Sequence, residues 1–227
     1  MGAITNYETP TDGAMGDQPK PWLLHAMDIS ALNFCAFAAC DAGLGPGASD
    51  DGDGILIASP NALDTGGVDI FHLPSEKRVL QLHPQKDANT GMVMSLAMFP
   101  SAPSNEQTRL TLMAGYEDGR VVVHYYDHPA IQISDGSWHK GMDCKAHSQP
   151  VLSLDLSPRR DVFFTSSADA VITAWMLEQA AGDSATGDEK CAFKTANTKH
   201  AGQQGLSVRS DGKIFATAGW DARARVA

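Results

Sequence analysis

The chain contains 227 residues, of which 27 are acidic and 17 are basic, and its formal net charge is −10 at pH 7. A protein that binds DNA or RNA needs basic side chains to neutralise phosphates, so this composition argues against direct contact with nucleic acid. The amino terminus lacks a signal segment, and no apolar run reaches the roughly 18 residues that a membrane-spanning helix needs, so we expect a soluble intracellular protein without membrane contact.

The amino-terminal part is predicted to be a polar tail followed by strands. Residues 1–20 are polar and are expected to form a disordered tail or linker. Residues 54–79 (GILIASPNALDTGGVDIFHLPSEKRV) have a strand, turn, strand outline. The acidic stretch 41–54 contains Asp51 and Asp53 but lacks the further ligands of a calcium-binding loop, so we expect a solvated loop there.

Residues 110–127 (LTLMAGYEDGRVVVHYYD) are predicted to form two further strands around a tight turn at Asp118. The side chains of His124, Asp127 and His128 resemble a metal-ligand cluster more closely than any others in the chain. Residues four apart on a strand lie about 13 Å from each other. We therefore expect a strand that ends in a turn, and no metal site.

Residues 147–175 carry the most specific pattern in the chain. His147 precedes Asp169 by 22 residues, while Asp169 follows Thr165 by four residues and precedes Trp175 by six. In a WD-repeat blade this spacing places the aspartate in a turn beside the histidine, and the histidine beside a hydroxyl that also meets the indole N–H. Each buried donor then has an acceptor, which avoids a cost of roughly 1–3 kcal/mol for an unpaired group. We predict a structural tetrad of His147, Thr165, Asp169 and Trp175.

The same unit recurs along the chain, as expected for a propeller. A shift of 52 residues places Thr217 and Asp221 on the hydroxyl and carboxylate positions, so the last copy is predicted to hold a partial tetrad. Its histidine position falls on Lys199, next to His200, and its tryptophan position falls on Ala227.

The two earlier copies depart further from the pattern. Asp118 keeps the turn position, but Ala114 replaces the hydroxyl residue and His124 replaces the tryptophan. In the first copy Phe71 stands at the tryptophan position. Apolar alternation still predicts strands in both copies, because it buries the faces of a sheet whether or not a tetrad reinforces it.

These repeats predict an all-β fold, a WD-repeat β-propeller with about four of seven blades present. We expect one domain over 21–227, with blades near 21–80, 81–133, 138–178 and 191–227. The stretch 178–190 is interpreted as an insertion that links the last two blades.

Motifs for catalysis are missing from the sequence, which contains no HExxH, GxSxG or phosphate-binding loop. We predict no enzymatic activity, no cofactor and no metal. The four cysteines show no CxxC or paired spacing and are expected to be buried thiols in a reducing compartment. The alternative is a propeller enzyme or small-ligand binder, in which polar side chains from several blades converge on the central channel.

A protein-docking surface is predicted at the residue that precedes each turn aspartate, because these positions face one end of a propeller. They are Glu117, Ala168 and Trp220. Trp220 is the preferred anchor, since a large aromatic side chain offers contact area with little entropy to lose. Packing of Trp220 against a neighbouring loop is the alternative interpretation.

Three phrases carry a closer resemblance: PWLLHAMDISALNFCAFA (21–38), GGVDIFHLPSE (66–76) and ATAGWDAR (216–223). They resemble the ASTRA-associated protein 1 family of filamentous fungi, whose animal relative is the G-protein beta-subunit-like WD-repeat protein. The resemblance covers most of 21–227 and implies a seven-bladed propeller without catalysis. It also implies a nuclear scaffold, with the cytoplasm as a second location, that joins ASTRA complex subunits in chromatin remodelling and telomere maintenance. A further implied partner is the co-chaperone that matures phosphatidylinositol-kinase-like kinases.

The resemblance also implies that blades are missing at both ends, two before the PWLLH segment and one after Ala227. Unpaired strand edges and apolar blade faces would then contact water, a situation that favours aggregation or pairing with another chain. We therefore expect the isolated chain to be marginally stable.

Overall fold

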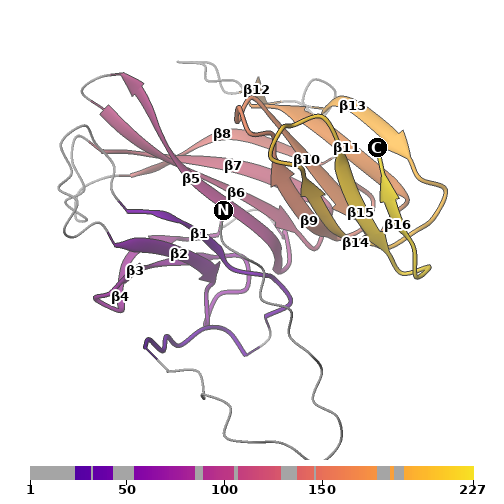
Figure 1. Cartoon of the computed structure of the whole chain (residues 1–227). Helices are drawn as coiled ribbons and strands as arrows, with labels where there is room; N and C mark the ends of the chain where they lie inside the picture. The colour runs from indigo at the N-terminus through magenta and orange to yellow at the C-terminus, as the bar shows by residue number, and fades with distance from the viewer. Residues whose placement is uncertain are drawn as a thin grey trace, which may run out of the picture.

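The described part of the chain folds into strands that form four successive sheets, coloured in chain order in Figure 1. The computed structural model describes residues 24–31, 33–42, 54–84, 89–104, 107–128, 137–145, 147–177, 185–186 and 192–227. The tail predicted over 1–20 lies outside these residues, as do Asp51 and Asp53 of the predicted acidic loop. Within the described ranges no helix is long and apolar enough to span a membrane.

Each sheet is an antiparallel meander of consecutive strands. The first sheet has the order β1 (Ala38–Asp41), β2 (Ile55–Pro60), β3 (Val68–Leu73) and β4 (Lys77–Leu82). The second has the order β5 (Val93–Ser104), β6 (Gln107–Tyr116), β7 (Arg120–His128) and β8 (Trp138–Lys145), followed by the short parallel strand β12 (Ala185–Thr186). The third contains β9 (Val151–Leu156), β10 (Val162–Ser167), β11 (Val171–Met176) and β13 (Ala192–Asn197). The fourth contains β14 (Gln203–Val208), β15 (Phe215–Gly219) and β16 (Ala224–Val226).

The sheets are arranged as the blades of a propeller. The first strands of neighbouring sheets contact one another, since β1 lies against β5, β5 against β9 and β9 against β14. Figure 1 shows the four sheets fanning out from this line of first strands. The prediction of an all-β propeller with four blades in this chain is confirmed.

The predicted blade boundaries differ from the sheets by one strand. β8 (Trp138–Lys145) was assigned to the blade over 138–178 and β13 (Ala192–Asn197) to the blade over 191–227, yet each is hydrogen-bonded to the preceding sheet. The repeat in the sequence begins with the outer strand of one blade and ends with the third strand of the next. The insertion over 178–190 also contributes β12, which pairs with β8 at Met142 and Asp143 and so extends the second blade.

The second blade is buried on both faces, which explains the continuous apolar run along β7. Val122 packs into a core shared with the first blade, where Leu56 and Ile70 lie. Val121 and Val123 point the opposite way, into a core shared with the third blade. Successive strand residues face opposite sides of a sheet, so one strand supplies both cores.

The junction between the third and fourth blades is hydrogen-bonded through side chains of β9. The hydroxyl of Ser153 accepts from the backbone N–H of Leu206 at 3.1 Å. The carboxylate of Asp155 accepts from the backbone N–H of Val208 at 2.7 Å. First strands have one unpaired edge, and these side chains satisfy backbone donors along that edge of β14.

A backbone brace repeats at each of the three junctions between blades. The backbone carbonyls of Thr65, Gly119 and Ala170 lie in the turns between second and third strands. These oxygens accept from the N–H groups of Val93, His147 and Thr198, which lead into the next blade. We define the turn face as the four turns 61–67, 117–119, 168–170 and 220–223. The braces fix the first three of these turns to the next blade.

The cysteines differ in state, and the expectation of free thiols is wrong for Cys144, which is disulfide-bonded. Cys144 lies on β8 and is buried, and the spacing of the cysteines in the sequence does not reveal that it is bonded. Cys35 and Cys40 are free. Burial raises the pKa of Cys35 to about 12 and that of Cys40 to about 11, so both thiols stay protonated near neutral pH.

Replacement of Asp155 by alanine is expected to destabilise the junction between the third and fourth blades. The backbone N–H of Val208 would lose its acceptor, so the free energy of unfolding should fall by roughly 1–3 kcal/mol in urea titrations. Asp211→Ala is the matched control, because that carboxylate lies on the surface beside Arg209, and its loss should be smaller. Equal effects of the two substitutions would contradict the assigned role of Asp155.

Candidate functional site

The third blade contains a buried chain of hydrogen bonds that joins four side chains. Trp175 Nε1 donates to Thr165 Oγ1 at 2.8 Å, and Thr165 Oγ1 lies 2.8 Å from His147 Nε2. His147 Nδ1 lies 3.2 Å from both carboxylate oxygens of Asp169. Because the Asp169 carboxylate can only accept, the proton of the neutral imidazole sits on Nδ1, and Nε2 accepts from the Thr165 hydroxyl. Each of these side-chain donors in the tetrad therefore has an acceptor.

Local strand geometry brings these residues together. Thr165 on β10 pairs with Thr173 on β11, and two residues further along Phe163 pairs with Trp175. Directly paired residues share a face of the sheet, so the hydroxyl and the indole lie on the same side. The rings of Phe163 and Trp175 stack with centroids 5.8 Å apart. The stacked rings of Phe163 and Trp175 thus form an apolar contact next to the hydrogen-bonded groups of the tetrad.

Asp169 fastens the turn between β10 and β11 as well as the histidine. Its carboxylate accepts from the backbone N–H of Val171 at 2.9 Å and from that of Ser148 at 3.0 Å. Burial lowers the pKa of His147, and the neighbouring charge of Asp169 opposes this shift only in part. The imidazole is therefore neutral near pH 7, with both nitrogens engaged in structural contacts.

The fourth blade does not bring its predicted partial tetrad together as a hydrogen-bonded chain. The hydroxyl of Thr217 donates to Gln203 Oε1 at 3.0 Å, and Gln203 is fully buried. Asp221 instead pairs with Arg225, and His200 lies 3.7 Å from its carboxylate on the surface. Gln203 was missed by the sequence analysis, since it follows the histidine position by several residues. A buried amide at the start of β14 takes the place of the imidazole beside the hydroxyl.

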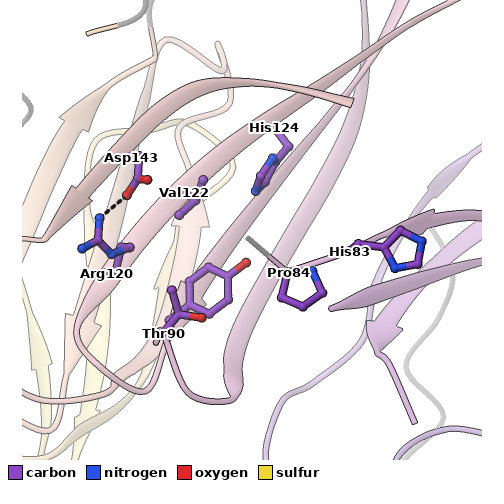
Figure 2. A pocket seen from close by; sticks show the side chains of 8 residues that line it. His83, Pro84, Thr90, Arg120, Val122, His124 and Asp143 are labelled. Atoms are coloured by element: carbon purple, nitrogen blue, oxygen red, sulfur yellow. Dashed lines mark hydrogen bonds and ion pairs between the residues drawn. The ribbon is translucent and has the colours of Figure 1, made fainter. Parts of the chain in front are cut away.

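The second blade replaces the tetrad with a small polar cavity, shown in Figure 2. His124 stands at the tryptophan position and Ala114 at the hydroxyl position, so both side chains are smaller than in the third blade. His124, Thr90, Tyr116, Arg120 and Asp143 are among the residues that line the cavity, which has room for roughly one water molecule.

Charged groups around this cavity are paired, whereas His124 is held neutral. Arg120 and Lys140 both bond to the carboxylate of Asp143, at 2.5 and 2.7 Å. Burial lowers the pKa of His124 to about 4, and the nearby Lys140 charge adds to that shift, while Asp143 opposes it. The imidazole of His124 is therefore uncharged at neutral pH.

The three candidate surface residues lie on equivalent turns of separate blades. Glu117 and Trp220 are exposed, and Ala168 is half-buried. Trp220 is 61% exposed, and the counterpart turn of the first blade carries Leu63, which is 97% exposed. Leu63 was missed because the first turn is longer, and its tip does not align with the residue before an aspartate.

No metal centre is seen within the described ranges, where no three His, Cys, Asp or Glu side chains are grouped to hold an ion. Asp127 of the cluster considered above is engaged by Arg109 through two hydrogen bonds, at 2.6 and 3.1 Å. His139 lies 3.5 Å from the same carboxylate. His124 points into the cavity of the second blade (Figure 2).

Comparison with known proteins identifies the repeat. Residues 139–175 match the family described as WD domain, G-beta repeat. The chain is 44% identical to ASTRA-associated protein 1 of Aspergillus niger over 226 residues, which covers 91% of this chain and 50% of the relative. Identity to ASTRA-associated protein 1 of Penicillium rubens is 42%, over 97% of this chain and 54% of the relative.

A mouse relative is also similar: guanine nucleotide-binding protein subunit beta-like protein 1 is 34% identical over 70% of this chain and 43% of its own length. The resemblance inferred from the three sequence phrases is thus confirmed. The chain spans about half the length of the curated relatives it matches. The matched segment 139–175 begins in β8 and ends in β11, which reproduces the one-strand offset between sequence repeat and blade.

Asp169→Ala is expected to lower the free energy of unfolding by roughly 1–3 kcal/mol, because His147 Nδ1 and two backbone N–H groups lose their acceptor. Urea titration followed by tryptophan fluorescence measures the loss. Asp118→Ala is the matched control in the second blade, where the carboxylate accepts from the backbone N–H of Arg120 and no histidine is involved. We expect a smaller effect there, and a larger one would refute the importance of the imidazole contact.

Acid is expected to destabilise the fold through His124. The folded-state pKa of about 4 lies below the ordinary value near 6.5, so the unfolded chain binds more protons between these limits. Stability should be full above about pH 6.5 and decline by up to about 3 kcal/mol as pH falls towards 4. Urea unfolding at several pH values tests this, with His124→Phe as the variant. A variant as acid-sensitive as the natural chain would show that His124 is not responsible.

Proposed function

We propose that this chain is a non-catalytic WD-repeat scaffold that acts as a subunit of the ASTRA complex. The observation that carries the proposal is the 42–44% identity, over more than nine-tenths of the chain, to fungal proteins named ASTRA-associated protein 1. Through that complex we place the chain in chromatin remodelling. We also place it in the maturation of phosphatidylinositol-kinase-like kinases through a co-chaperone.

The architecture supports a scaffold because its polar side chains are engaged in holding the blades together. Both nitrogens of His147 are occupied, Asp169 fastens a turn, and Asp155 caps the edge of the next blade. The rim of turns offers exposed side chains to a partner, among them Leu63 and Trp220. Rigid rims of this kind suit protein docking, since little conformational entropy is lost when a partner binds.

Residence in the nucleus, with the cytoplasm as a second location, belongs to the same proposal. It follows from the role in the ASTRA complex, not from any import signal in the chain. A propeller enzyme or small-ligand binder remains the second class of function. It would need polar side chains from several first strands to converge on the channel, whereas the polar cavity of Figure 2 is lined by the second blade and by the segment that leads into it.

Affinity purification of the tagged chain from a fungal cell, followed by mass spectrometry, tests the proposal. We expect recovery of ASTRA subunits and of the kinase-maturation co-chaperone, with nuclear localisation of a fluorescent fusion. A version extended to the length of the relatives serves as the positive control. Recovery of these partners by the extended version but not by this chain would place the docking surface outside residues 1–227. Failure of both versions would refute the proposed function.

A further inference from the structure

We propose that the turn of the fourth blade is a docking site for an acidic peptide segment with an apolar side chain. The site, called the Trp220 platform, consists of Lys199, His200, Gly202, Trp220 and Arg223. The inference deepens the proposed scaffold function and rests on it, since it names the chemistry of a partner segment.

The indole of Trp220 is exposed yet held in a fixed orientation. Its Nε1 donates to Gln204 Oε1 at 3.0 Å, and the ring covers the backbone of Gly202. A Cβ at Gly202 would lie 2.1 Å from the ring, and the φ of Gly202 is +74°, so only glycine permits this contact. An aromatic anchor that is already ordered loses little entropy when a partner covers it.

The backbone beneath the platform is tied to two blades. The N–H of Trp220 donates to the carbonyl of Gly202 at 2.9 Å. The N–H of Gly202 in turn donates to the carbonyl of Ala168 in the third blade at 3.0 Å. The exposed ring therefore does not sit on a free loop. Packing against its own neighbours leaves 61% of Trp220 accessible.

The surface around Trp220 is basic in an otherwise acidic protein. The segments 198–204 and 219–225 contain Lys199, Arg223 and Arg225 against the single acid Asp221, a formal charge of 3 − 1 = +2, whereas the whole chain carries −10. Asp221 is itself paired with Arg225. Lys199 and Arg223 are exposed, and in the described part of the chain no ion pair engages either of them.

Charge complementarity selects the partner. Two exposed cations beside an ordered indole fit a segment in which carboxylates flank a leucine or phenylalanine, and repel a basic segment. The equivalent turn of the second blade presents the acid Glu117 instead of an exposed indole between two basic residues.

Fluorescence anisotropy with purified chain tests the site. The probe is a labelled synthetic peptide that alternates glutamate with leucine and phenylalanine, and the comparison peptide has lysine in place of glutamate. We expect binding of the acidic peptide only, with weaker binding as salt is raised. Trp220→Ala should weaken binding by at least about tenfold, as for the central anchor of an interface.

Two further variants keep the result interpretable if Trp220→Ala disturbs the fold. Lys199→Glu combined with Arg223→Glu changes only exposed side chains and should also weaken binding by about tenfold or more. Leu63→Ala is the matched control, because Leu63 is an exposed apolar residue on the equivalent turn of the first blade, and it should leave binding unchanged.

Equal binding of the two peptides, or binding that survives both platform variants, would overturn the proposal. A change confined to the oligomeric state of the chain would show that a second copy occupies the platform, which also refutes the acidic-peptide assignment. The peptide assay needs no ASTRA subunit. Its failure, with ASTRA subunits still recovered by affinity purification, would leave the scaffold function standing without this site.

Discussion

The fold depends on the burial of both faces of a blade, because this leaves polar backbone groups only at strand ends and free edges. In the second blade, neighbouring valines of β7 point into opposite cores. Buried backbone N–H and C=O groups at turns and free edges lack a ladder partner, so they need other hydrogen-bond partners. The braces from Thr65, Gly119 and Ala170 supply these partners at the turns, and Asp155 supplies one along an edge. The tetrad likewise provides hydrogen-bond partners for buried polar side chains.

The blades differ in how they fill the position of the tetrad, and the differences follow from size and polarity. The third blade fills the space between sheets with Trp175 and uses Thr165 and His147 to pair its indole N–H. The second blade has smaller residues there, and a polar cavity lined by His124 remains. The fourth blade pairs its threonine with a buried glutamine. Hydrophobic clusters join the first three blades, and the hydrogen-bonded side chains of the third blade add a constraint on its turn.

Sequence spacing predicted the all-β propeller because apolar alternation and the intervals around Asp169 are local. The contact of Gln203 with Thr217 could not be predicted in that way, since an amide and an imidazole share no spacing rule. The disulfide at Cys144 could not be predicted either, because none of the four cysteines shows a paired spacing in the sequence. The offset of β8 and β13 arises because a repeat in sequence is defined by its loops, whereas a blade is defined by hydrogen bonds between strands. Local sequence patterns therefore predicted where the strands lie. Which blade each strand joins is decided by long-range pairing between strands.

The turn face explains how one framework carries different recognition chemistry. The backbone N–H groups of Glu117, Ala168 and Trp220 are each bonded to a carbonyl at the start of the same blade's first strand. That bond constrains the main chain and leaves the side chain outside the core. Stability therefore does not dictate which residue stands there, and an acid, a methyl group and an indole occupy equivalent positions. A surface whose shape is fixed by backbone contacts and whose chemistry is free to change can acquire a partner without loss of the fold.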